Sequence, residues 1–136
     1  MVKDVVCALI VHEGKLLITQ HGMHAGHPWK WEFPGGKIQP EEKPEEALTR
    51  EIREELEIAV TPDTRLIPVT HAYADKEIRL HPFLCRWTGG TITLNEHHVF
   101  AWILPEEISR FDMLEADHQM LAEGDNFARL LDYARA

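Results

Sequence analysis

Three glutamates stand close together in the stretch EIREEL, at positions 51, 54 and 55. If this stretch is helical, Glu51 and Glu55 form an i,i+4 pair of like charge, which costs an isolated helix about 0.2–0.5 kcal/mol. A divalent cation bound between the carboxylates would remove this cost, and hard ions such as Mg²⁺ and Mn²⁺ prefer oxygen ligands. The alternative is an ordinary charged face in contact with water, because runs of charge are common on helix surfaces. The first chemistry that these residues suggest is therefore metal binding.

A Gly-Gly turn at Gly35 and Gly36 precedes the acidic stretch. Because glycine has no side chain, this turn can bring backbone carbonyl oxygens close to the carboxylates. The residues that follow predict a helix over residues 44–57, since Pro44 suits a first helical turn and strong helix formers come after it. The β-branched IAV and the TPD sequence then predict the end of the helix.

The predicted helix carries an apolar stripe beside the three glutamates. At about 100° per residue, Leu48, Ile52 and Leu56 fall on one side, which suits packing against a sheet. Charges on the outward side form i,i+4 pairs of opposite sign, which stabilise a helix and need no functional explanation. The predicted pairs are Glu46 with Arg50 and Arg53 with Glu57.

Composition limits the class of protein and its partners. We expect one domain over residues 1–136, because an internal boundary would leave two undersized pieces. A formal net charge of -9 disfavours nucleic acid or an anionic membrane as a partner, since both require a basic face. No apolar run is long enough to span a membrane, and Cys7 and Cys85 lie in strand-like runs that indicate buried thiols, with a single disulfide as the alternative. These features predict a cytoplasmic protein.

The rest of the chain predicts strands and a C-terminal helical region. Residues 5–11 and 15–19 are apolar runs joined by the short turn HEG. After the helix, the runs LIPVTHAY, EIRLHPFLCRW and TITL predict an antiparallel meander, and VFAWIL predicts a further strand. Residues 117–134 have apolar positions at helical spacing, with a break at Gly124. Because strands and helices do not alternate regularly, the predicted fold class is α+β, with helices packed on a mixed, largely antiparallel sheet.

The glycine turn and the acidic helix together resemble the Nudix hydrolase signature, GX5EX7REUXEEXGU, in which U is aliphatic. One fixed position differs, because Glu57 stands where the family has glycine. Glycine would ease a left-handed cap at this helix end, so we expect a modest local cost and no loss of chemistry. The flanking stretches WEFPGGKI and NEHHVFAWILPEEI resemble the MutT-like branch of the family. The signature positions that this chain shares are Gly36, Glu42, Arg50, Glu51, Ile52, Glu54, Glu55 and Ile58.

This resemblance implies an α/β/α sandwich and a metal-dependent reaction. A nucleoside triphosphate brings about four negative charges to an acidic protein, so a cation must neutralise charge and orient the phosphates. The resemblance implies Mg²⁺, with Mn²⁺ as an alternative, and implies that one of the helix carboxylates accepts a proton from the attacking water while Arg50 braces them. Glu96 matches a late glutamate that reaches the metal in MutT-like members, and a solvated loop residue is the alternative. The implied metal ligands are the carbonyl of Gly35 and the side chains of Glu51, Glu54, Glu55 and Glu96.

The resemblance also implies contacts with the substrate. Glu32 and Phe33 match positions that line the nucleobase pocket, and Lys37 is either a phosphate contact or a solvated lysine. Near the C-terminus, Glu115 or Asp117 falls where relatives read the base edge, although Asp117 could equally be a helix N-cap. The predicted substrate contacts are Glu32, Phe33, Pro34, Gly35, Gly36, Lys37, Glu115 and Asp117.

Histidines cluster in two loops of the sequence. His21, His24 and His27 are spaced i, i+3, i+6 and could bind zinc, but a polar loop is the simpler interpretation because no partner ligands stand at structural-site spacing. MutT-like relatives usually have arginine where this chain has QH after the second predicted strand, which leaves that contact open. His97 and His98 follow Glu96 and are candidate phosphate contacts.

Three functions are compatible with the sequence. The leading hypothesis is Mg²⁺-dependent hydrolysis of a nucleoside triphosphate to a monophosphate and pyrophosphate, either to cleanse 8-oxo-dGTP from the nucleotide pool or to act on CTP or dCTP. The second keeps the fold and changes the substrate to a nucleotide sugar or dinucleoside polyphosphate. The third is a non-catalytic nucleotide-binding domain, which the complete carboxylate set disfavours because binding alone would tolerate a loss. We expect a small nucleotide as substrate, and a monomer or homodimer.

Overall fold

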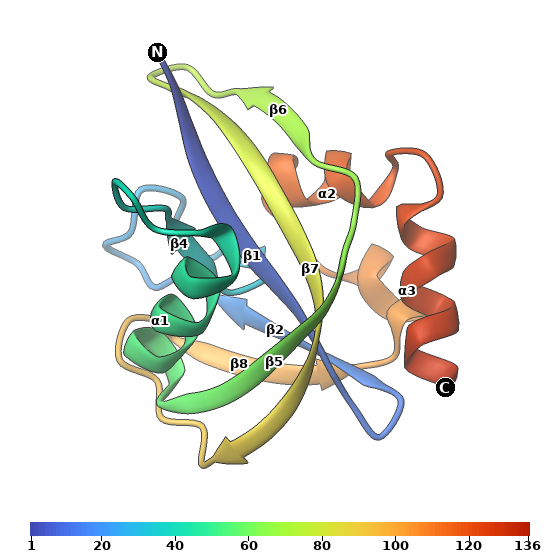
Figure 1. Cartoon of the computed structure of the whole chain (residues 1–136). Coiled ribbons are helices and arrows are strands. Elements are labelled where there is room, and N and C mark those ends of the chain that lie inside the picture. Colours follow the sequence, from blue (N-terminus) through green and yellow to red (C-terminus); the bar gives the residue numbers. More distant parts are fainter.

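The computed structural model describes every residue from Met1 to Ala136 (Figure 1). Strands dominate the first two thirds of the chain, and short helices close it. The elements in chain order are β1 (Val2–His12), β2 (Lys15–Gln20), β3 (Trp31–Glu32), β4 (Gly35–Lys37), α1 (Pro44–Leu56), β5 (Ile58–Arg65), β6 (Val69–Ala72), β7 (Glu77–Gly90), β8 (Val99–Ile103), the 3-10 helix η1 (Pro105–Arg110), α2 (Glu115–Leu121) and α3 (Asn126–Arg135).

All eight strands belong to one sheet. Its central path runs β3-β2-β1-β7-β5, while β4 pairs with β1, β6 with β7 and β8 with β2. The long strands β1 and β7 lie side by side and are parallel, and every other pairing is antiparallel (Figure 1). The predicted mixed, largely antiparallel sheet is confirmed.

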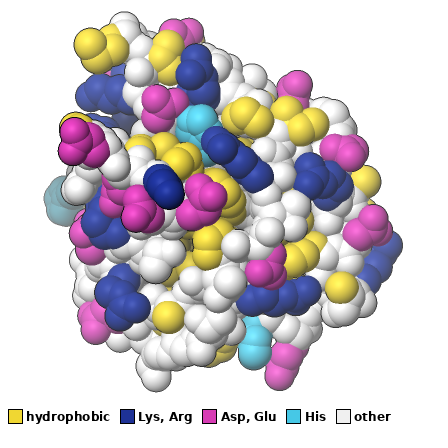
Figure 2. All heavy atoms as spheres, viewed as in Figure 1, with side chains coloured by type: hydrophobic (Ala, Val, Ile, Leu, Met, Phe, Trp, Pro, Cys, Tyr) yellow, Lys and Arg dark blue, Asp and Glu magenta, His cyan; other side chains and the backbone are white.

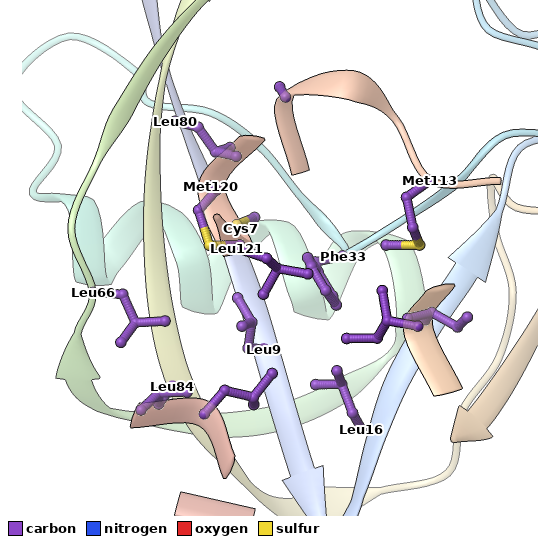
Figure 3. Packing of buried hydrophobic residues seen from close by; sticks show 14 of the residues in the cluster. Cys7, Leu9, Leu16, Phe33, Leu66, Leu80, Leu84, Met113, Met120 and Leu121 are labelled. Atoms are coloured by element: carbon purple, nitrogen blue, oxygen red, sulfur yellow. The ribbon is translucent and has the colours of Figure 1, made fainter. Parts of the chain in front are cut away.

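The sheet is covered by helices on both faces, with a hydrophobic core on each. Successive residues of β1 point to opposite faces because a strand has a period of two. Cys7 and Leu9 therefore pack toward α2 and α3, in the cluster drawn in Figure 3. Ala8 and Ile10 pack toward α1 on the other face. Both thiols are free and buried, and Cys85 belongs to the opposite core from Cys7, so the two thiols do not form a disulfide.

After α1, one strand was not predicted and one predicted strand is absent. The helix ends before IAV and TPD as predicted, but these residues also form the unpredicted β5, which continues through Pro62 with a register shift between Pro62 and Thr64. Proline is tolerated there because β5 is an edge strand, where a missing N–H costs little. The TITL stretch is not a strand, since β7 ends at Gly90 and the Thr93 N–H donates to the carbonyl of Leu56 at the end of α1 (2.9 Å).

The helical predictions agree closely with the structure. The predicted helix 44–57 is α1, which ends one residue earlier, at Leu56. The predicted break at Gly124 separates α2 from α3, and Gly124 adopts a positive φ of 49°. No helix of the protein is long and apolar enough to cross a membrane.

Candidate active site

The Gly-Gly turn packs directly against the carboxylates of α1. β4 pairs with β1 next to the helix, and the Gly35 N–H donates to Oε1 of Glu55 (3.1 Å). A Cβ at Gly36 would lie 2.3 Å from the Glu51 carboxyl carbon, and one at Gly35 would lie 1.9 Å from the carbonyl oxygen of Val6. The backbone of β1 excludes any side chain at Gly35, and a side chain at Gly36 would displace the Glu51 carboxylate, so the turn and the acidic helix form one structural unit.

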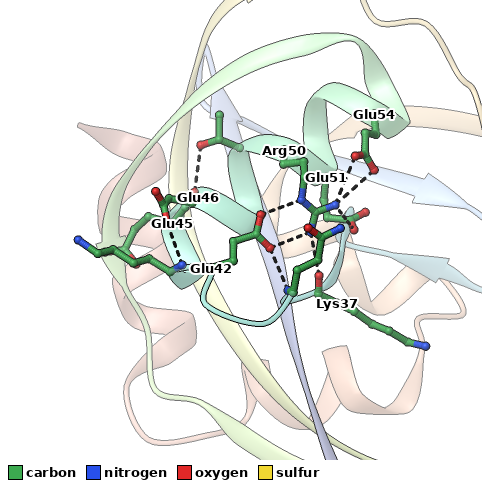
Figure 4. A network of polar contacts seen from close by, with 10 residues as sticks. Lys37, Glu42, Glu45, Glu46, Arg50, Glu51 and Glu54 are labelled. Atoms are coloured by element: carbon green, nitrogen blue, oxygen red, sulfur yellow. Dashed lines mark hydrogen bonds and ion pairs between the residues drawn. The ribbon is translucent and has the colours of Figure 1, made fainter.

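Arg50 ties the outer carboxylates together, as Figure 4 shows. Its guanidinium makes two short contacts to Glu42, at 2.8 and 2.9 Å, and one to Glu51 at 2.9 Å. Weaker contacts of 3.4 Å reach Glu54, and Nη2 also donates to the carbonyl of Lys37 (3.0 Å). The hydrogen bonds from Arg50 lower the pKa of Glu42 to about 2. Arg50 thus fixes the directions in which these carboxylates point.

The outward ion pairs expected from sequence are not those observed. Arg50 pairs with Glu42, Glu51 and Glu54 rather than with Glu46. The Glu46 carboxylate instead accepts a hydrogen bond from the Lys43 N–H (2.9 Å), where it caps the helix start. The prediction of a Glu46 to Arg50 pair is wrong because the turn before α1 brings Glu42 within reach of the guanidinium.

Glu55 has a different environment from the other acids of α1. Its side chain is buried, with 5% of its surface exposed. Burial raises its pKa to about 10, and the nearby carboxylates of Glu32, Glu96 and Glu51 add to this shift. Glu55 therefore sits among negative charges with no cationic side chain to balance it.

The loop after β7 brings Glu96 to this cluster. The Asn95 N–H donates to the carbonyl of Glu55 (3.1 Å), and the Asn95 amide donates to the carbonyl of Glu54 (2.8 Å). These bonds fasten the loop to the last turn of α1, and the charge of Glu96 also raises the pKa of Glu51, whose largest contribution is burial. Glu96 itself is exposed.

The donor set of this cluster suits a hard divalent cation. All its candidate side-chain ligands are carboxylates, from Glu51, Glu54, Glu55 and Glu96, and hard ions such as Mg²⁺ and Mn²⁺ prefer such oxygens. Burial first, and then the neighbouring negative charges, raise the pKa of Glu55, and a bound cation would stabilise its ionised form. The residues present therefore fit the metal that the sequence resemblance implies.

A cavity of about 210 Å³ adjoins the carboxylates. Its wall includes five of the predicted substrate contacts from the WEFPGGK segment, and Asp117 from α2. Asp117 is 4% exposed and accepts a hydrogen bond from the Phe33 N–H (3.0 Å). Burial, together with the charge of Glu32, raises the pKa of Asp117 well above its usual value. The five residues of the segment are Glu32, Phe33, Gly35, Gly36 and Lys37.

Two predicted substrate contacts do not line this cavity. Pro34 is buried, and its carbonyl accepts the Ala8 N–H (2.8 Å). Glu115 is exposed and lies 3.3 Å from Nε2 of His71. The alternative of Asp117 as a helix N-cap is wrong, because α2 begins at Glu115 with Leu114 in the capping position. Of the two acids near the C-terminus, only Asp117 reaches the cavity.

A larger cavity of about 680 Å³ lies elsewhere, between η1 and the C-terminal helices. Residues such as Ile108, Met113 and Phe127 line it, and none of the α1 carboxylates does. A cavity distant from all candidate ligands offers no means of acting on a phosphate. The cavity of about 210 Å³, which Gly35 and Gly36 line beside the carboxylates, is the candidate substrate site.

Lysines gather near the smaller cavity. Lys37 and Lys76 line it, and the charge of Lys3, with a smaller contribution from Lys76, lowers the pKa of Lys37. Figure 2 shows basic and acidic side chains interspersed over the face that α1 and β4 occupy in Figure 1. An acidic protein thus offers local positive charge beside its carboxylates, as binding of a phosphate chain requires.

Sequence reasoning missed a partnership between two histidines and Glu32. Oε2 of Glu32 lies 3.0 Å from Nε2 of His21 and 2.7 Å from Nε2 of His97. His24 and His27 take no part, and the ring of His27 packs against Tyr73 instead (4.9 Å). The only signal in the sequence was the QH pair in place of arginine, and strand pairing was needed to find its partners.

A mixed sheet with helices on both faces is an α/β/α sandwich, and the candidate active site lies at its acidic helix α1. The solved MutT protein from Methanosarcina mazei superposes with a TM-score of 0.80, covering 98% of this chain and 96% of that chain at 26% sequence identity. The family model described as NUDIX domain matches residues 1–124. The chain belongs to the Nudix hydrolase family, as the signature predicts.

The curated relatives of this chain are named as enzymes, which supports an enzymatic function for this member of the family. A CTP pyrophosphohydrolase from Escherichia coli is 34% identical over 118 residues, which cover 87% of this chain and 87% of that protein. An 8-oxo-dGTP diphosphatase from Proteus vulgaris is 52% identical over 54 residues, which cover 40% of this chain and 48% of that protein. The chain is similar to the first over most of its length and to the second over a shorter, more identical segment.

Proposed function

We propose that this protein hydrolyses a nucleoside triphosphate to a nucleoside monophosphate and pyrophosphate. The observation that carries the proposal is the buried Glu55 carboxylate, held against Gly35 and surrounded by Glu32, Glu51 and Glu96. Such clustering is costly without a cation, and a triphosphate adds about four negative charges. Binding divalent cations and polyphosphate together relieves both costs.

The proposed cation is Mg²⁺, with Mn²⁺ as the alternative. When bound, it supplies charge neutralisation and a more acidic water. Arg50 is a positioning residue, because its bonds to Glu51 and Glu54 fix the directions of these carboxylates before a substrate arrives. The proposed ligands are Glu51, Glu54, Glu55, Glu96 and the carbonyl of Gly35.

The proton of the attacking water goes to an exposed carboxylate. Glu55 is buried against Gly35, and Glu51 is bound closely by Arg50, so neither is free to turn toward a water. Glu54 keeps 57% of its side chain exposed, and Glu96 is exposed as well. We assign the proton acceptor to one of these two residues.

The cavity beside the carboxylates is the proposed site for the nucleoside. Phe33 and Tyr73 give it apolar and aromatic walls, and Lys37 and Lys76 offer ammonium groups to the phosphates. Burial raises the pKa of Asp117, which favours the protonated carboxyl group, and in that form the group both donates and accepts hydrogen bonds at the base edge. The site uses elements from both faces of the sheet, so we propose that residues 1–136 act as one functional unit.

The names of the relatives suggest which bases to test. CTP or dCTP is the first candidate, because the CTP pyrophosphohydrolase is similar along most of the chain. 8-oxo-dGTP is the second, because the 8-oxo-dGTP diphosphatase is more identical over its shorter segment. The cavity itself does not favour one of these bases.

Identification of all hydrolysis products, nucleoside monophosphate and pyrophosphate among them, over a panel of nucleotides with Mg²⁺ tests the proposal. The panel contains CTP, dCTP, dGTP and 8-oxo-dGTP, with a nucleotide sugar and a dinucleoside polyphosphate as other linked diphosphates. We expect pyrophosphate from at least one triphosphate, and loss of turnover in Glu54→Gln/Glu96→Gln. If only the linked diphosphates were hydrolysed, they and not a triphosphate would be the substrate class. If a nucleotide bound without any hydrolysis, the protein would be a non-catalytic nucleotide-binding domain.

A further inference from the structure

His21, Glu32 and His97 come together from three separate parts of the chain. β2 pairs with β3 on one side, which sets Thr19 opposite Glu32, and with β8 on the other. The His98 N–H donates to the carbonyl of Gln20 (2.8 Å), which holds the loop before β8 against the end of β2. Strand pairing therefore brings the backbone of these three residues together.

The three side chains converge on one point. The Nε2 atoms of both histidines face the same carboxylate oxygen of Glu32, at 3.0 Å for His21 and 2.7 Å for His97. One ligand atom from each residue lies within 4.8 Å of the other two. Two ligands of one zinc ion, each at about 2.0–2.2 Å, lie roughly 3 Å apart. The two distances from the histidines to Glu32 are close to that separation.

The cluster is shielded from water but not satisfied by the protein alone. His97 keeps 5% of its side chain exposed, and His21 and Glu32 keep 18% each. Nε2 of His21 is buried and lacks a well-directed hydrogen bond, even though it lies close to the carboxylate. Both imidazole Nε2 atoms converge on one carboxylate oxygen, to which His97 already makes the shorter contact of 2.7 Å, so a cation shared by the three side chains suits this arrangement.

We propose that His21, Glu32 and His97 form a second metal site, for a borderline transition-metal ion such as Zn²⁺ or Co²⁺. Two imidazoles and one carboxylate are ligands that such ions prefer, whereas Mg²⁺ prefers oxygen alone. Three protein ligands leave a coordination position open. Because His21 and Glu32 line the cavity, this open position lies beside the proposed nucleoside site.

The site is distinct from the carboxylates of α1 in ligand chemistry and in origin. None of its three ligands comes from α1, and it would bind its ion whether or not the protein hydrolyses triphosphates. Glu32 nevertheless links the two, because its charge contributes to the raised pKa of Glu55. An ion bound to Glu32 would lower the negative charge that Glu55 experiences.

Titration of the full chain with Co²⁺ in saturating Mg²⁺ tests the proposal. Mg²⁺ occupies the oxygen-only cluster, and the visible absorption of Co²⁺ reports its ligands and geometry. We expect stoichiometric binding in the wild type, and binding weaker by on the order of tenfold or more in His21→Gln/His97→Gln. The matched control is His24→Gln/His98→Gln, which removes exposed histidines from the same two loops and should bind as the wild type does.

Imidazole NMR of the wild type with Zn²⁺ gives a second measurement that needs no variant. The proposal expects the ring signals of His21 and His97 to shift and those of His24 and His98 to stay. Absence of Co²⁺ binding, equal binding by both double variants, or zinc shifts at other histidines would each overturn it. Since no nucleotide is added, failure here leaves the proposed hydrolysis unaffected, and failure of hydrolysis leaves this site unaffected.

Discussion

Arg50 balances one group of carboxylates in the acidic cluster, whereas no cationic side chain balances Glu55. Around Arg50, the carboxylates of Glu42, Glu51 and Glu54 each have a guanidinium contact. Around Glu55, three further carboxylates approach and no cationic side chain does. The pKa of Glu42 falls to about 2 and that of Glu55 rises to about 10. Glu51 lies between the two environments, and burial raises its pKa even though it contacts Arg50.

The contrast separates charges that the protein itself balances from a charge that it leaves unbalanced. A carboxylate paired with arginine stays ionised and points in a fixed direction, whether or not a cation is bound. A buried carboxylate among like charges is stable only when protonated or when a cation is bound. Counting acids in the sequence does not make this distinction, because it depends on which partners the fold supplies.

The largest expected effect comes from removing the charge at the unbalanced site. In Glu55→Gln the amide keeps an oxygen to accept the Gly35 N–H, so the turn is retained while a proposed ligand loses its charge. We expect turnover to fall on the order of 10²–10³-fold in pyrophosphate release, because charge stabilisation at the reacting phosphate is weakened. Glu45→Gln, an exposed acid in the first turn of α1, is the control and should keep full activity. Unchanged turnover in Glu55→Gln would remove Glu55 from the site.

The next effect is a dependence of cation stabilisation on pH. The pKa of Glu55 is raised in the folded state, from 4.5 to about 10, so without a cation the protein loses stability as pH rises through this interval. A bound cation takes the place of the proton, and we expect Mg²⁺ to raise Tm more at pH 9 than at pH 5. At about 100 times its Kd, a ligand stabilises by about 2.7 kcal/mol.

Thermal unfolding with and without Mg²⁺ across this pH range checks the dependence. In Glu55→Gln the titrating group is gone, so the gain from Mg²⁺ should no longer grow with pH. A gain that is independent of pH in the wild type would mean that the cation binds without displacing a proton from Glu55.

A smaller effect is expected at the balanced site. Arg50→Gln removes the partner of three carboxylates, and we expect Tm at neutral pH to fall by about 5 °C. Since the pKa of Glu42 is depressed, its contribution is present above pH 4.5 and is lost as pH falls toward about 2. The variant should therefore lose less Tm than the wild type over that acid interval.

Arg53→Gln provides the matched control for Arg50, because Arg53 is exposed on the same helix and forms no ion pair. Its Tm should follow the wild type at every pH. If Arg53→Gln lowered Tm as much as Arg50→Gln does, helix propensity or net charge would explain the loss. The ion pairs of Arg50 would then make no specific contribution to stability.

Much of the architecture could be predicted from the sequence because its signals are local. The apolar stripe and Pro44 predicted α1 to within one residue, and the break at Gly124 was found by its residue type. The partner of Arg50 could not be predicted from helix spacing, because Glu42 lies outside the helix and the preceding turn folds it back. The contact between Glu32 and His97 could not be predicted either, because these residues are 65 positions apart and come together only through strand pairing. The roles of the site residues stay predictions.

The smallest expected effect concerns the departure from the family signature at Glu57. Glu57 caps α1 in the left-handed conformation, with φ 58° and ψ 30°, and its N–H donates to the carbonyl of Arg53 (3.0 Å). A side chain strains this conformation, so we expect Glu57→Gly to stabilise the protein by about 1 kcal/mol, or roughly 3 °C in Tm. Glu57→Ala keeps the strain and should give no such gain. Turnover should match the wild type in both variants, because the strained residue lies beyond the carboxylates; a change in turnover with glycine would mean that the cap helps to aim Glu54 and Glu55.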